Sequence, residues 1–232
     1  MTVGLVLVFL TFVYGRSANA IRTWRAASFL CGMFLVWVAL GSPLVAYEHD
    51  LLTVHMIQHL LLMTVAPALI LLGRPPVLQR PVVQRFAQTW FRPALCWTVA
   101  ALTLVVWHVP AVFTLAMHSE TWHSVEQSAF LGAGLFFWWP VVQPSSSVSI
   151  APQWSTLVYL FLATLPCDVL SAFLVFSDRV AYPVYFSMPR HFGLSVVEDQ
   201  QFAAALMWTC VTMIYLVPAA IVSTRLLSPR TF

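Results

Sequence analysis

The sequence contains no lysine and few charged residues of any kind. All eleven basic residues among the 232 are arginine, and charged residues make up 8% of the chain. A typical soluble domain carries ~25% charged residues. Together with 60% hydrophobic residues and a mean hydropathy of +0.85, this composition excludes an ordinary soluble fold and predicts a membrane protein. The net charge of +3 comes from arginine clusters between apolar runs, so it indicates membrane topology and not nucleic-acid binding.

The chain also lacks paired cysteines. Cys31, Cys96, Cys167 and Cys210 are far apart and form no CxxC or CxxxC motif. This spacing gives no support for a disulfide framework or a thiolate copper motif. We interpret the four thiols as small buried helix residues.

Long apolar runs are abundant. A helix needs ~20 residues to cross the hydrocarbon core of a bilayer. We expect an all-α polytopic membrane protein with seven transmembrane helices in one domain, residues 1–232, because no linker is long enough to separate a second domain. The expected spans are roughly 2–20, 26–43, 51–73, 93–109, 121–140, 154–176 and 199–223.

The arginines predict the orientation of these helices. With seven spans, nine arginines fall on one side of the membrane, and only Arg179 and Arg190 fall on the other. The nine are Arg16, Arg22, Arg25, Arg74, Arg80, Arg85, Arg92, Arg225 and Arg230. Because basic loops stay in the cytoplasm, we expect the N-terminus outside and the C-terminus inside. All seven histidines then lie at the outer end of the bundle.

Two histidines one turn apart stand out in the third expected helix. In VHMIQHLLLM, residues 54–63, His55, His59 and Met63 are spaced i, i+4 and i+8 and share one helix face. Imidazoles inside a membrane are costly unless they meet partners, so this stripe is a candidate functional site. Two imidazoles and a thioether suit a soft transition metal such as copper, although methionine at such a position is also a common packing residue.

Other polar residues are expected at the same level. His123 lies three and four residues before Glu126 and Gln127, and His108 closes the fourth span, where it caps carbonyls or completes the site. Asp168, near the middle of the sixth span, is the exception. An ion pathway needs polar groups along its whole length. The inner half of the expected bundle has almost none, so a channel is excluded.

Several segments resemble those of the CtaG-type cytochrome c oxidase assembly proteins, a seven-helix bacterial family. They are VHMIQHLLLMTVAPALILLGRPP at 54–76, WHVP at 107–110, FFWWPVV at 136–142, AYPVY at 181–185 and DQQFAAALMW at 199–208. The resemblance runs from about residue 50 to 208. It implies seven transmembrane helices and a role in maturing a haem-copper oxidase by supplying copper.

The resemblance also extends to single residues. It covers His55, His59, His108, His123, Glu126, Asp199, Gln200, Met207 and Trp208. The chain departs from the family pattern at two places. Gln127 stands where the family usually has a histidine directly after the glutamate of the fifth span. Ala203 and Ala204 stand where glycines are expected. His55, His59 and His123 still suffice for three-coordinate Cu(I).

These observations predict a non-enzymatic assembly factor of the bacterial inner membrane. Copper is expected on His55, His59, His123 and His108, with Met63, Glu126, Gln127, Asp168 and Asp199 as orienting groups or further ligands. Its expected partners are haem-copper oxidase subunits, membrane lipid and a periplasmic copper chaperone. One alternative is an accessory subunit stably bound to a respiratory oxidase, although the aromatic content gives no reason to expect haem. The other is a zinc-dependent membrane hydrolase built on His55, His59 and Asp168.

Overall fold

The computed structural model describes residues 23–143, 153–189 and 193–227. These residues form helices and turns, with no strand among them. This confirms the all-α class. The expected first span, 2–20, lies outside the described residues, as do Arg16, Arg22, Arg190, His191 and Arg230.

The expected positions of the other six spans are close to the observed helices. The sequence did not predict two short helices, α5 (Pro81–Trp90) and α7 (Pro110–Met117). In chain order the elements are α2 (Thr23–Gly41), the 3-10 turn η2 (Pro43–Tyr47), α3 (Leu52–Leu60), the π-helical turn η3 (Leu61–Val65), α4 (Ala66–Leu72), the 3-10 turn η4 (Pro76–Gln79), α5 (Pro81–Trp90), α6 (Pro93–Trp107), α7 (Pro110–Met117), α8 (Glu120–Val142), α9 (Gln153–Val175), the 3-10 turn η5 (Pro183–Ser187) and α10 (Val196–Leu227).

Four stretches of the described chain are long and apolar enough to cross a membrane. They are Trp24–Tyr47, Leu52–Leu72, Trp154–Val175 and Val196–Leu227. A fifth results if α5 and α6, bent by 79° at their junction, count as one span. The seven spans and the orientation of the termini therefore stay predictions.

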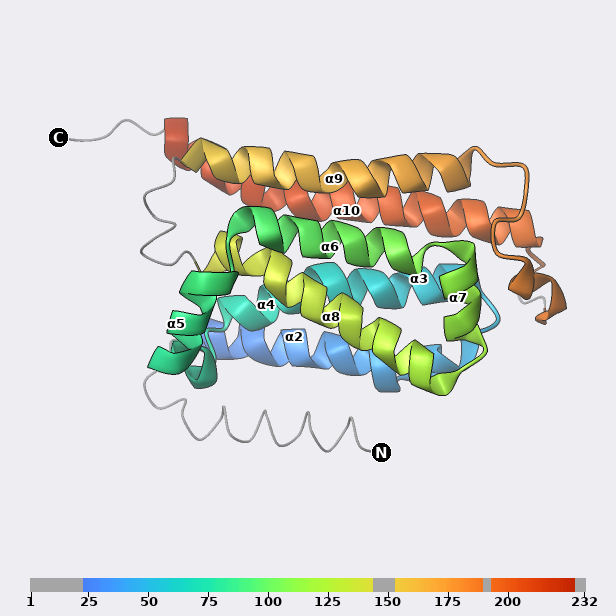
Figure 1. The fold of residues 1–232 in the computed structure, drawn as a ribbon, viewed down its shortest axis with the longest axis horizontal. Coiled ribbons are helices and arrows are strands. Elements are labelled where there is room, and N and C mark those ends of the chain that lie inside the picture. Colours follow the sequence, from blue (N-terminus) through green and yellow to red (C-terminus); the bar gives the residue numbers. More distant parts are fainter. Residues whose placement is uncertain (1–22, 144–152, 190–192, 228–232) are drawn as a thin grey trace.

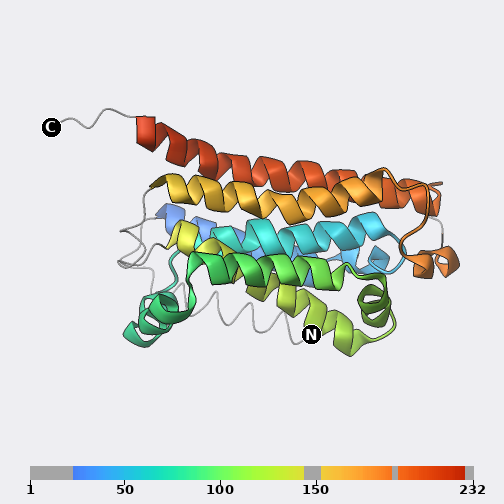
Figure 2. The same ribbon diagram turned by 45° about the horizontal axis from the view of Figure 1, so that its top comes forward.

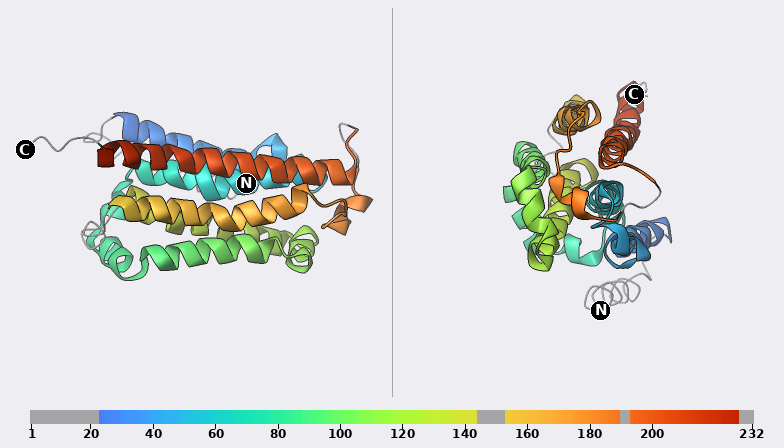
Figure 3. Two further views of the ribbon diagram at one scale, coloured as in Figure 1. Left: turned by 90° about the horizontal axis from the view of Figure 1, so that it is seen from above. Right: turned by 90° about the vertical axis from the view of Figure 1, so that its right-hand side faces the viewer.

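The long helices run side by side along one axis (Figures 1 and 2). α9 packs against α10, α10 against α3, α2 against α4, and both α4 and α6 against α8. A view along the axis shows α3 enclosed by its neighbours (Figure 3, right). Proline begins α5, α6 and α7, where its fixed φ and missing N–H are harmless.

The two ends of the bundle carry different side chains. The described arginines gather where α2 begins, around α5, and at the end of α10, with Arg179 as the exception. The opposite end, marked by α7 in Figure 1, contains the start of α3, the end of α6 and the start of α8. Six histidines lie at this end, in the turn before α3, in α3, after α6, after α7 and in the first turns of α8. They are His49, His55, His59, His108, His118 and His123. The predicted gathering of histidines at one end is thus confirmed for the six that the structure describes.

Candidate metal centre

Helices α3 and α8 bring two histidines and one glutamate together. His55 and His59 lie one turn apart on α3, and Glu126 faces them from α8. The Nε2 atoms of both imidazoles lie 3.6 Å from Glu126 Oε1. The His55 and Glu126 side chains are fully buried, and that of His59 is 6% exposed. One potential ligand atom from each residue lies within 4.8 Å of the others.

This group has polar atoms without hydrogen-bond partners. Both ring nitrogens of His55, both of His59 and both carboxylate oxygens of Glu126 are buried without a hydrogen bond to any described residue. The 3.6 Å separations exceed the 2.7–3.2 Å of an N–H···O hydrogen bond. Aromatic rings wall the group in, since Phe113 lies 5.0 Å from the His55 ring and Phe130 lies 3.9 Å from the His59 ring, between centroids. A buried polar group left unsatisfied costs about 1–3 kcal/mol, so such a cluster needs an explanation.

A carboxylate from a distant helix fixes the start of α3. Asp199 on α10 accepts hydrogen bonds from the backbone N–H of Leu52 at 2.7 Å and of Thr53 at 3.1 Å, and from the Thr53 hydroxyl at 2.6 Å. A negative charge at a helix N-terminus satisfies its free N–H groups and complements the helix dipole. Asp199, expected as an orienting group for the imidazoles, thus acts on the helix that carries them. Its neighbour Gln200 anchors the chain after α9 by accepting from Ala181 N at 2.7 Å.

A π-helical turn begins two residues after His59, at Leu61. In η3 the backbone leaves α-helical register, and Gly134 of α8 packs against it so closely that a Cβ there would lie 2.5 Å from the Met63 carbonyl oxygen. π-turns occur often at functional sites. The predicted i, i+4, i+8 stripe therefore holds as α-helix through His59 only. Met63 lines a cavity that His59 also lines.

That cavity has a volume of about 40 Å³. His59 and His108 border it at one end, together with Met63, Cys167 and Met207. The His108 ring lies 6.2 Å from the His59 ring, and its Nδ1 lies 2.7 Å from the Leu104 carbonyl oxygen, which fits a capping role. Its Nε2 is buried without a hydrogen-bond partner in the described part of the chain.

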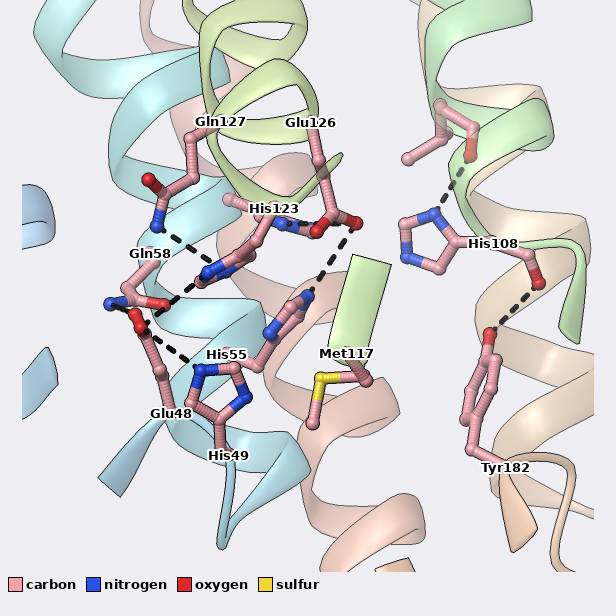
Figure 4. Close-up of polar contacts among 12 residues, drawn as sticks. Glu48, His49, His55, Gln58, His108, Met117, His123, Glu126, Gln127 and Tyr182 are labelled. Atoms are coloured by element: carbon pink, nitrogen blue, oxygen red, sulfur yellow. Dashed lines mark hydrogen bonds and ion pairs between the residues drawn. The ribbon is translucent and has the colours of Figure 1, made fainter. Parts of the chain in front are cut away.

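His123 lies between the buried group and a second polar group. Its ring stacks on that of His55 at 5.6 Å, while its Nδ1 lies 3.6 Å from Glu48 Oε1 (Figure 4). Gln127 lies against the other ring nitrogen, Nε2, at 3.3 Å. Burial raises the pKa of Glu48, and this effect outweighs the opposing ones of the Gln58 hydrogen bond and of His49.

Sequence reasoning did not select Glu48, His49 or Gln58 as site residues. The signal that was available is the acidic-histidine run EHD at 48–50, expected at the same end of the bundle as His123. In contrast, Asp168 on α9 is half-buried and forms no hydrogen bond or ion pair with any described residue. It belongs to neither of the groups of metal-ligating side chains, so the set His55, His59 and Asp168 proposed for a zinc hydrolase is not assembled in the described structure.

The architecture defines a class: a bundle of apolar helices with a buried histidine–glutamate group near one end. The chain matches the family model described as cytochrome c oxidase caa3 assembly factor (Caa3_CtaG) over residues 6–228. This match spans nearly the whole chain, so the protein belongs to that family of assembly factors, as the resemblance predicted. No curated protein and no solved structure gave a match.

Proposed function

We propose that the protein binds copper at His55, His59 and Glu126 and supplies it to a haem-copper oxidase during assembly. The observation that carries this proposal is the set of six buried, unsatisfied nitrogen and oxygen atoms on these three side chains. Two ligand atoms that each lie ~2.1 Å from a shared ion, at bond angles of ~109–120°, are ~3.4–3.6 Å apart. The two 3.6 Å separations at Glu126 Oε1 fit that spacing.

The charge of the group favours a monovalent ion. Neutral imidazoles add no charge, so Cu(I) and the Glu126 carboxylate together are neutral. A divalent ion leaves one uncompensated positive charge, which is costly among buried phenyl rings. Trigonal coordination by two nitrogens and one oxygen leaves a side open for a receiving ligand, which a carrier needs and a structural site does not.

The distribution of charge supports an outer location for this site. If the arginine-rich end of the bundle faces the cytoplasm, as basic loops do, the histidine end lies on the outer side of the bacterial inner membrane. Copper then comes from a periplasmic chaperone, and the receiving oxidase subunit docks near α7 and the start of α8. Binding and passing on an ion convert no substrate into a product, so the role is that of an assembly factor and not of an enzyme.

Metal analysis of purified protein tests the proposal. We expect about one tightly held copper per chain after loading with Cu(I) and removal of weakly bound ion, and loss of that copper in the double variant His55→Ala/His59→Ala. His118→Ala is the matched control, because His118 is exposed and its ring contacts the Thr114 carbonyl. Oxidase maturation in cells should fail with the double variant and proceed normally with His118→Ala. Native protein that holds zinc but no copper, or normal maturation with the double variant, would contradict the proposal.

A further inference from the structure

A second group of metal-ligating side chains lies next to the buried one. It consists of Glu48 and His49, in the turn between η2 and α3, and His123 in the first turns of α8. The side chain of His49 is 44% exposed, whereas those of Glu48 and His123 are 6% and 8% exposed. Unlike the buried group, this one reaches the surface.

The geometry of this second group matches that of the first. Glu48 Oε1 lies 3.6 Å from His49 Nε2 and 3.6 Å from His123 Nδ1. These separations again exceed hydrogen-bond length and fit ligand atoms around one ion. The other carboxylate oxygen of Glu48 accepts a hydrogen bond from Gln58 Nε2 (Figure 4). Gln58 Nε2 also donates to the Ala39 carbonyl at 2.9 Å. Gln58 therefore holds Glu48 with one oxygen turned toward the two imidazoles.

His123 connects the two groups. Its ring lies 5.2 Å from that of His49 and 5.6 Å from that of His55, and the His55 ring lies 4.3 Å from that of His59. Four imidazoles thus form a continuous row from the surface to the buried glutamate. The Glu48 carboxylate lies beside the two outer imidazoles, and the Glu126 carboxylate lies beside the two inner ones.

On the basis of the proposed function, we propose that Glu48, His49 and His123 form an entry site that receives copper at the exposed His49 side chain and passes it to His55, His59 and Glu126. Transfer proceeds by ligand substitution. A bond from the ion to His55 forms as the bond to His49 breaks, while Glu48 and His123 stay bound. Bonds to His59 and Glu126 then form as the bonds to Glu48 and His123 break. The oxidation state of the ion does not change, and no reductant or oxidant is needed.

The rate of copper loading separates this role from equilibrium binding. Purified protein is mixed with Cu(I) held by a weak soluble chelator, and loading is followed in the native chain, His49→Ala, Glu48→Gln and the control His118→Ala. We expect His49→Ala and Glu48→Gln to load at least ~10-fold more slowly and to reach the same final content of tightly held copper after weakly bound ion is removed. His118→Ala should load at the native rate.

A second measurement uses the chain whose buried site is removed. His55→Ala/His59→Ala should retain a weaker copper site in titrations with Cu(I), and adding His49→Ala should abolish it. Native loading rates in both His49→Ala and Glu48→Gln, or no weak site in the double variant, would overturn the entry site while leaving the proposed function intact. A native chain that binds no copper would overturn both. Size-exclusion elution and helical content show that each variant is folded.

Discussion

At the scale of single residues, the charge of Glu126 is the feature that suits the buried group to copper. Replacing it with glutamine keeps its size and removes the negative charge. We expect Glu126→Gln to lower the affinity for Cu(I) by ~10–100-fold, because the ion then stays positively charged inside an apolar wall. Competition with a chromophoric Cu(I) chelator measures this affinity. Glu120→Gln, an exposed residue of the same helix, should bind copper as the native chain does.

Replacing Gln127 with histidine should raise the affinity for Cu(I). The Gln127 amide lies 3.3 Å from His123 Nε2, at the position where the family usually has histidine. An imidazole there adds a nitrogen ligand beside His123, so Gln127→His should bind Cu(I) ~10-fold more tightly. The same chelator competition tests this. An unchanged affinity would mean that position 127 faces His123 without reaching the ion.

Asp199 contacts the start of α3 and is not among the residues of the proposed copper site. In Asp199→Asn the charge at the helix N-terminus is lost, and the amide N–H₂ opposes one of the backbone donors of Leu52 and Thr53. We expect a loss of about 1 kcal/mol in stability, measured as a lower unfolding temperature in detergent, together with weaker copper binding. Asp178→Asn, at an exposed site, is the control. Unchanged stability in Asp199→Asn would show that Thr53 and the backbone suffice to fix α3.

At the scale of elements, the packing of α8 against the π-turn sets the distance between Glu126 and the two histidines. A methyl group at Gly134 would meet the Met63 carbonyl oxygen at 2.5 Å and Pro67 at 2.6 Å. We expect Gly134→Ala to destabilise the protein by ~1–3 kcal/mol and to reduce copper retention, because α8 must move away from η3.

Gly132 provides the matched comparison for Gly134→Ala. It lies two residues earlier on α8, and an added Cβ there meets no atom within 4 Å. Gly132→Ala should therefore unfold at or slightly above the native temperature, since alanine favours helix over glycine by ~0.5–1 kcal/mol. Equal effects of the two substitutions in thermal unfolding would argue against close packing as the cause.

At the scale of the whole molecule, the separation of arginine from histidine predicts how the bundle lies in the membrane. A reporter active only in the cytoplasm should work when inserted at η4, next to Arg74 and Arg80, or when fused to the C-terminus. A reporter active only after export should work after Ser177, between α9 and α10. The opposite pattern of activities would place the histidines in the cytoplasm and exclude delivery from the periplasmic side.

Much of the fold follows from local patterns in the sequence. Apolar runs of about 20 residues located the long helices that the structure describes, because crossing a bilayer imposes both length and composition. The π-turn at η3 was not predictable, since Leu61–Val65 has the same apolar composition as its neighbours. The π-turn lies where α8 approaches closely at Gly134, a contact between residues far apart in the chain.

The candidate site was also predictable from the sequence in part only. The sequence by itself determined that His55 and His59 share a helix face, because a helical spacing of four residues is a local property. Only the tertiary structure decided how the other polar groups lie. Glu126 faces the pair, and Glu48 lies 3.6 Å from His123. Asp199 caps α3, and Asp168 belongs to neither group of metal-ligating side chains. Those pairings depend on the rotation and depth of each helix against its neighbours, and side-chain packing across the whole bundle sets both.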